Sequence, residues 1–271
     1  IDNNGVGAGV GDFSLANFTP SDLNLWQFDG FYDVAGTGLQ SLIAHPGQNL
    51  ASIDNDTNTP VLIGDITSLN MQQIGVFTDS GTTTALSPTV TLAAANPLIG
   101  AGQTVTGTGI PPNTTVVSIS TTTLTLSNNA TASGTVVLTF NNNISVSGGI
   151  VSLHPYLFVY GNNGLIQNCS AGNTNDWVSA DANATNVASG KIVQGLPVRG
   201  GSNAPSGLFW SLDSLIRVSF IGGTGTPPQY WRYDIISSQS SILSSQSAIE
   251  YDGVYYWCGV DRFLLYNGVV K

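Results

Sequence analysis

Aspartates are the main side chains in this sequence that could perform acid–base chemistry. The 271 residues include 16 acidic side chains, and Glu250 is the only glutamate. A glycosidase needs two carboxyl groups at a defined separation, one with a raised pKa, so that one acts as acid while the other acts as base or nucleophile. No two acidic residues have a spacing that marks such a pair. We therefore predict that the chain is not an enzyme.

The two histidines each precede a proline, as His45-Pro46 and His154-Pro155. Both pairs stand ahead of an apolar run, which suggests equivalent positions in a repeated unit. A histidine that serves as a general base in a triad needs a nucleophile and an orienting carboxylate. No serine and aspartate can be assigned to either histidine by spacing, so we predict no catalytic residue.

Two short segments resemble ligand-binding loops only in part. The run from Asp54 to Asn58 alternates oxygen ligands like the first half of a calcium loop, but Thr59 stands where the loop glycine belongs and Asp65 would have to replace the bidentate glutamate. An Asx-rich turn is the preferred interpretation. The glycines between Gly5 and Gly11 lack the spacing and the flanking helix of a dinucleotide fingerprint. We predict no metal and no cofactor.

Cysteines and tryptophans are few. Cys169 and Cys258 could form one disulfide or none, and neither belongs to a CxxC pair, so small buried thiols are favoured over a metal site. Trp177, Trp210 and Trp231 are expected to pack in the core, with a ligand-stacking platform as the alternative.

The chain is strongly acidic. Only 8% of the residues are charged, the net charge is −10 and the pI is about 4.1. Six basic residues cannot form the positive face that nucleic-acid binding requires. A surface that repels a polyanion is compatible with this balance.

No stretch of the sequence reaches the roughly 20 apolar residues of a membrane span. An N-terminal basic segment followed by an apolar core, which would mark a signal peptide, is not found either. The last strand-like segment runs almost to Lys271, and we expect the chain to be a piece of a longer protein.

The segment from Tyr251 to Gly268 predicts a β-hairpin that is rich in aromatic residues and bracketed by Asp-Gly and Asn-Gly turns. Such strands suit a sheet covered on both faces. Similar apolar-turn-apolar units run from Leu157 to Ile166 and from Leu208 to Val218. A fourth is expected between Leu23 and Tyr32. One hairpin is only marginally stable in water, so the repetition matters.

The hairpins that start at 157, 208 and 254 are 51 and 46 residues apart. A period of this length holds about four short strands, which is one blade of a β-propeller. The sequence therefore predicts an all-β protein with a partial or complete propeller-like domain over 23–86 and 141–271. Residues 1–22 are expected to form a flexible N-terminal segment. An ordinary β-sandwich with aromatic-rich strands remains the alternative.

The segment 87–140 differs in composition from its surroundings. It contains no Trp, Tyr, Asp, Lys or Arg and is dominated by Thr, Ser, Val, Ala and Gly. Five short runs alternate with period two, which predicts a small β-sandwich or barrel inserted into the larger domain. The flanks 76–79 and 144–146 are expected to be neighbouring strands of one blade. The insert resembles a Thr/Ser-rich module of phage tail and other virion proteins.

Four stretches carry a wider resemblance. They are 151–164, which includes the Tyr160-Gly161-Asn162-Asn163-Gly164 turn, 204–211, 240–245 and 251–257. With these stretches the chain resembles the tail hub or nozzle proteins of short-tailed bacteriophages. The resemblance implies a structural protein of the virion tail, built on a β-propeller. It also implies a ring of identical copies, expected to be a hexamer, that continues the DNA channel below the portal and adaptor.

In that family context the ring retains the genome and then releases it. The implied partners are the adaptor or portal, tail fibre or spike proteins, and genome DNA that passes without specific binding. The alternative function is a carbohydrate-binding or receptor-binding tail module that uses the inserted domain or the tryptophans named above.

Overall fold

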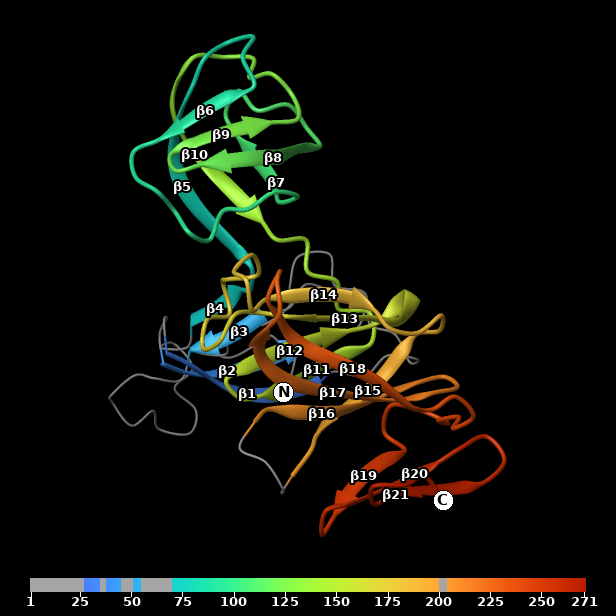
Figure 1. Ribbon diagram of the computed structural model, residues 1–271. Helices are drawn as coiled ribbons and strands as arrows, with labels where there is room; N and C mark the ends of the chain where they lie inside the picture. The colour runs from blue at the N-terminus through green and yellow to red at the C-terminus, as the bar shows by residue number, and fades with distance from the viewer. Residues whose placement is uncertain (1–26, 35–37, 45–50, 55–69, 200–203) are drawn as a thin grey trace, which may run out of the picture.

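The computed structural model describes residues 27–34, 38–44, 51–54, 70–199 and 204–271 (Figure 1). These residues form β-strands, with one short 3-10 helix, η1, at Asn162–Gly164. The predicted all-β class is confirmed. Within the described part of the chain, no helix is long and apolar enough to cross a lipid bilayer.

Four antiparallel sheets are each built from strands that pair in chain order. The first sheet consists of β1 (Gln27–Asp33), β2 (Gly38–Ala44), β3 (Ala51–Asp54) and β4 (Asn70–Gln73). The second sheet consists of β11 (Gly149–Leu153), β12 (Tyr156–Tyr160), β13 (Leu165–Asn168) and β14 (Asn183–Asn186). The third sheet consists of β15 (Ile192–Pro197), β16 (Ser206–Ser211), β17 (Leu215–Thr224) and β18 (Gln229–Ser237). The fourth sheet has three strands, β19 (Ala248–Tyr251), β20 (Val254–Cys258) and β21 (Phe263–Tyr266).

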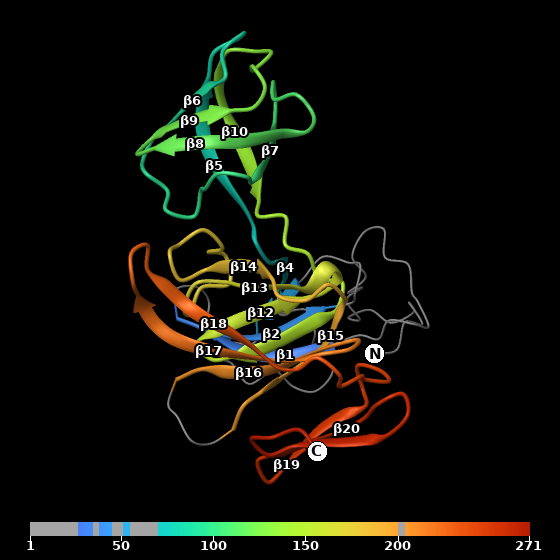
Figure 2. The ribbon, with the colours of Figure 1, turned by 45° about the vertical axis from the view of Figure 1, so that its right-hand side comes forward.

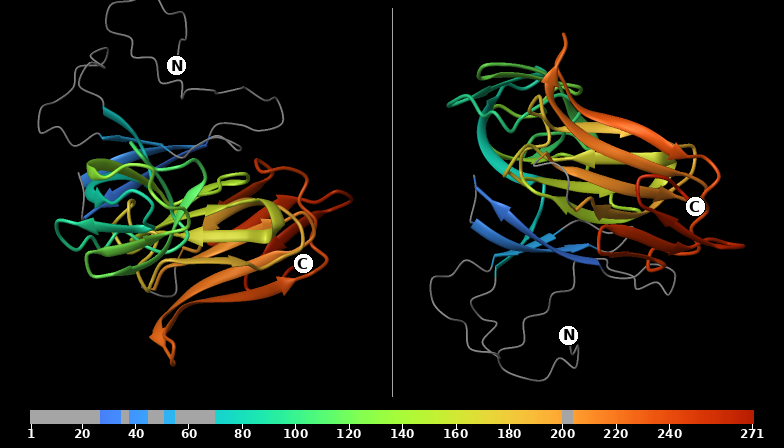
Figure 3. Two further views of the ribbon diagram at one scale, coloured as in Figure 1. Left: turned by 90° about the horizontal axis from the view of Figure 1, so that it is seen from above. Right: turned by 60° about the horizontal axis from the view of Figure 1, so that its bottom comes forward.

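These sheets pack face to face in the order in which they occur along the chain. Separate apolar clusters join the first sheet to the second, the second to the third, and the third to the fourth. The opening strands lie together, with β1 beside β11 and β11 beside β15. Figure 3 shows the second and third sheets between the first and the fourth.

The strand β12 illustrates why a continuous apolar run suits this packing. Its five residues are all buried. Because side chains alternate across a strand, Leu157 and Val159 contact the first sheet while Tyr156, Phe158 and Tyr160 contact the third. The strand β16 is divided in the same way, with Phe209 in one cluster and Trp210 in the next.

The predicted hairpins are confirmed at three of four places. The pairs β12–β13, β16–β17 and β20–β21 are antiparallel neighbours. The hairpin expected between Leu23 and Tyr32 is wrong for its described part, because Asp29-Gly30 does not turn. Residues 27–33 instead form the single strand β1, which pairs with β2 without interruption.

Between β4 and β11 the chain forms a closed six-stranded barrel that stands apart from the four sheets (Figures 1 and 2). Its strands are β5 (Val76–Thr83), β6 (Thr89–Leu92), β7 (Thr104–Gly107), β8 (Thr114–Ser120), β9 (Thr123–Leu126) and β10 (Gly134–Asn141). Val90, Leu124, Leu138 and Phe140 fill its interior, while threonines alternate with them along the strands. Pairing of β7 with β10 closes the barrel.

The barrel begins earlier than the insert predicted over 87–140. Five of its strands lie in that segment, but the sixth, β5, lies before it. The expectation that 76–79 pairs with 144–146 in one blade is wrong, because all eight residues of β5 pair with β10. A glycine in β5 permits the closure, since a Cβ at Gly81 would lie 2.6 Å from Val90 Cγ1.

Candidate functional site

The residues with catalytic potential are dispersed over the described structure. His154 is exposed at the turn between β11 and β12, where its ring lies 6.3 Å from that of Phe31. No hydrogen bond joins His154 to a serine or an aspartate within the described residues. His45 lies outside them, so the proposed equivalence of the two histidines stays a prediction.

The calcium-like segment lies almost wholly outside the described residues, as does the glycine-rich segment from Gly5 to Gly11. Only Asp54 is described, at the end of β3, where its backbone pairs with Gln40 and Asn70. Among the described residues, no three His, Cys, Asp or Glu side chains are grouped closely enough to hold a metal ion.

No disulfide joins the two cysteines. Cys169 is buried, and its sulfur accepts a hydrogen bond from the backbone N–H of Leu157 at 3.3 Å. Cys258 is only partly buried, on β20. The favoured interpretation as small buried thiols is therefore confirmed for Cys169 and only in part for Cys258.

The three tryptophans considered as ligand platforms are buried in the clusters between sheets. Trp177 lies between the first and second sheets, Trp231 between the second and third, and Trp210 between the third and fourth. Their preferred interpretation as core residues is confirmed. Trp231 also forms part of a pocket wall.

A polar cleft of about 300 Å³ lies where the opening strands meet. Its walls include side chains of β1, β11 and β15, together with a glutamine that precedes β19: Gln27, Asp29, Ile150, Gln194, Leu196 and Gln246. Three consecutive sheets thus contribute to one cleft, although Gln27 of the first sheet and Ile150 of the second are 123 positions apart in the chain.

In this cleft, two side chains of β1 form hydrogen bonds with backbone groups at the edge of the second sheet. Gln27 donates through Nε2 to the carbonyl oxygen of Gly148 at 3.0 Å and accepts from the N–H of Ile150 at 2.9 Å. Asp29 accepts from the N–H of Ser152 at 2.7 Å. Edge strands otherwise present unpaired backbone groups, so these contacts hold the first two sheets in register.

Asp29 is the ionisable side chain in the wall of the cleft, and its pKa is shifted. Burial raises the pKa of its carboxyl group above 3.8, although hydrogen bonds from the backbone of Ser152 and Gly30 act in the opposite direction. Both carboxylate oxygens are used in these bonds. The cleft therefore serves as a structural junction between the first two sheets.

The described residues cover only one face of the fourth sheet. Tyr255 and Trp257 point into the cluster shared with the third sheet. The cross-strand register places the following residues on the opposite face: Ile249, Tyr251, Val254, Tyr256, Cys258, Phe263 and Leu265. On this outer face, the side chains of Phe263 and Tyr251 are 85% and 74% exposed. The expectation that the strands of this hairpin are covered on both faces is therefore wrong for the described chain.

The first sheet has a corresponding outer face at the other end of the series. Phe28 and Tyr32 alternate with the buried Phe31 along β1, and both are more than half exposed. Isolated exposed apolar residues are common on proteins, but contiguous apolar faces mark interaction surfaces. Among the described residues, the apolar outer face of the fourth sheet and the two exposed aromatic residues of β1 are the main surface features that the sequence did not reveal.

The basic residues are all described and form few ion pairs. Arg199 lies 3.5 Å from Glu250, while Arg232 and Arg262 pair with the nearby Asp234 and Asp261. These pairs are largely exposed and contribute little to stability. They also neutralise part of the small positive charge available to an anionic ligand.

Comparison with protein-family models, curated proteins and solved structures found no match to this chain.

Proposed function

We propose that this chain is a structural protein of a short-tailed bacteriophage virion, a tail nozzle or hub subunit that assembles with copies of itself into a ring. The observation that carries the proposal is the apolar outer face of the fourth sheet, which no described residue covers, together with the exposed Phe28 and Tyr32 of the first sheet. The resemblance of the sequence to tail nozzle proteins supplies the biological context.

In this proposal the four sheets are blades of a propeller-like domain. Each sheet pairs its strands in chain order, and the opening strands β1, β11 and β15 lie side by side. Blades of a propeller are arranged in this way around an axis. The polar cleft at Gln27 and Asp29 then corresponds to the axial end of the blades.

The occupant of the uncovered faces is a second copy of the chain. Within one chain each sheet already packs its apolar face on the next sheet. A neighbouring copy that places its Phe28 and Tyr32 against Tyr251 and Phe263 would cover both faces in a contact between chains. Because the two faces differ, this head-to-tail contact repeats and generates a ring when the rotation closes. We expect six copies.

The charge of the chain suits a ring around passing DNA. A net charge of −10 repels phosphates. A positive lining would instead bind DNA tightly through counterion release. A duplex therefore slides past such subunits without sticking.

The assembly is tested by sedimentation velocity and light scattering of the purified chain over a range of concentrations. We expect a ring-sized species that dissociates in the variants Tyr251→Ser and Phe263→Ser. Val137→Ser is the matched control, because Val137 is 63% exposed on the barrel. Cys258 lies on the same face, so its reaction with a maleimide should slow as the ring forms. A monomer at all concentrations would refute the assembly.

The virion assignment is tested separately by immunogold electron microscopy of phage particles that carry this chain. Label at the tail, below the portal, is expected. Label on the capsid, or particles without label, would refute the assignment even if the chain forms rings.

The alternative is a receptor-binding tail module that uses the barrel. It is favoured by the position of the barrel, which extends away from the sheets on two connecting segments (Figure 2). Exposed apolar residues of its strands include Val117 and Val137. Adsorption of the purified chain to host cells that is lost in Val117→Ser, with ring formation intact, would support this function.

A further inference from the structure

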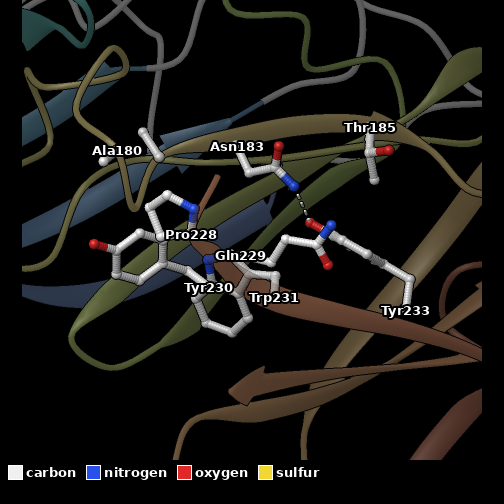
Figure 4. A pocket seen from close by; sticks show the side chains of 9 residues that line it. Ala180, Asn183, Thr185, Pro228, Gln229, Tyr230, Trp231 and Tyr233 are labelled. Atoms are coloured by element: carbon white, nitrogen blue, oxygen red, sulfur yellow. Dashed lines mark hydrogen bonds between the residues drawn. The ribbon is translucent and has the colours of Figure 1, made fainter. Parts of the chain in front are cut away.

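A second pocket, of about 290 Å³, lies between the outer strands of the second and third sheets. It is formed by β14, by β18 and by the segments next to them, about 50 residues apart in sequence. The side chains that matter here are those of Asn183, Thr185, Gln229, Tyr230, Trp231 and Tyr233 (Figure 4). None of them takes part in the apolar faces or the cleft described above.

The aromatic wall of this pocket is held rigidly from behind. Trp231 packs edge-on against Tyr156 and Phe158, with ring centroids 4.8 Å away in both cases. Its indole N–H donates to the carbonyl oxygen of Asp181 at 3.2 Å. Tyr230 is half-buried and packs on Phe220, with the two ring centroids 6.3 Å apart. Rigid aromatic rings lose little conformational freedom when a ligand binds.

The polar side chains supply hydrogen-bonding groups of both kinds. Asn183 donates through Nδ2 to the hydroxyl oxygen of Tyr233 at 2.9 Å, so the hydroxyl proton of Tyr233 is directed elsewhere. Burial raises the pKa of Tyr233 to about 12, which keeps the phenol protonated at neutral pH. The amide of Gln229 and the hydroxyl group of Thr185 also line the pocket (Figure 4).

The lining contains no Asp, Glu, Lys, Arg or His. A charged ligand buried here would find no counter-charge, and burial of an unpaired charge is costly. The volume is at the lower end of the range of about 300–1,000 Å³ for ligand pockets. These properties favour a small, uncharged molecule with both apolar faces and many hydroxyl groups.

We propose that the pocket binds a neutral sugar residue of an oligosaccharide, with an apolar face of the sugar ring against Tyr230 and its hydroxyl groups bonded to Asn183, Gln229 and Tyr233. The site is distinct from the barrel and independent of ring formation. It gives the chain a binding function beside its structural one.

The test uses the purified full chain and neutral glucose, galactose and mannose trisaccharides, with saturation-transfer NMR to detect binding and titration to measure Kd. At least one trisaccharide is expected to bind. Asn183→Ala, Gln229→Ala and Tyr230→Ala should each weaken binding about tenfold or more. Gln239→Ala is the matched control, because Gln239 is exposed outside the pocket.

Gln229→Ala is the decisive variant, because Gln229 is exposed and its loss leaves the fold intact. Thermal unfolding of each variant checks that the fold is retained. Absence of binding for all three sugars at millimolar concentration would overturn the proposal. Binding that survives Gln229→Ala and Tyr230→Ala would overturn it as well, whether or not the chain forms rings.

Discussion

Trp210 and Trp257 form a natural matched pair for testing the packing between the third and fourth sheets. Both are essentially fully buried, and their rings meet edge to face with centroids 5.7 Å apart. They differ in one respect. The indole N–H of Trp257 donates to the carbonyl oxygen of Ser241 at 3.0 Å. The indole N–H of Trp210 has no acceptor within the described residues.

The perturbation is the same substitution at both positions, Trp210→Phe and Trp257→Phe. The loss of apolar contacts is similar, because both side chains lie in one cluster. Trp257→Phe removes the donor of a hydrogen bond to the partly buried Ser241, whereas Trp210→Phe removes a buried N–H that is already unpaired. Each unpaired buried group costs about 1–3 kcal/mol. Trp210→Phe should therefore be the more stable variant by about 1–3 kcal/mol, the cost of the buried N–H that it removes.

The assay is equilibrium unfolding in urea followed by far-UV circular dichroism, with both variants and the wild type at one protein concentration. With a urea dependence of about 1–3 kcal/mol per molar, the two midpoints should differ by about 1 M. Equal midpoints, or a lower midpoint for Trp210→Phe, would refute the reasoning from unpaired groups.

Two further predictions concern the barrel and the cleft. Gly81→Ala should destabilise the protein by about 1–3 kcal/mol in thermal unfolding through overpacking, since its Cβ would lie within 3 Å of Val90 and Leu138. Gly30→Ala is the control and should change the stability little, because the space around its Cβ is open. Similar losses of stability in the two glycine variants would contradict this reasoning. The raised pKa of Asp29 means that its contribution to stability is present below pH 3.8 and is lost as pH rises through the folded pKa. The Tm of the wild type should therefore fall relative to that of Asp29→Asn as pH rises from 3.5 to 7. A difference in Tm that stays constant over this range would be evidence against a raised pKa of Asp29.

Local patterns in the sequence predicted several elements correctly. The runs at 157, 208 and 254 became strands followed by turns and partner strands, and the Thr-rich runs after 87 became five strands of the barrel. These successes share a cause. Alternation with period two and turn residues with positive φ, such as Asp252 and Gly253, act over a few neighbouring positions.

Other features could not be predicted, because they depend on pairing between distant residues. Nothing near Val76 indicates that β5 pairs with β10, about 60 residues later. The Asp29-Gly30 pair has the composition of a turn, yet pairing with β2 keeps it extended. The candidate sites were missed for the same reason, since their side chains come from different sheets.

From the sequence alone, the β class, most strands and the acidic surface were determined, because strand periodicity and charge are properties of the residues themselves. The tertiary structure decided which faces of those strands are covered, and it leaves Phe263 and Tyr251 exposed among the described residues. It also placed Asn183 beside Tyr233. The physical reason is that burial depends on which sheets pack together, and two segments with the same alternation can differ entirely in what covers them.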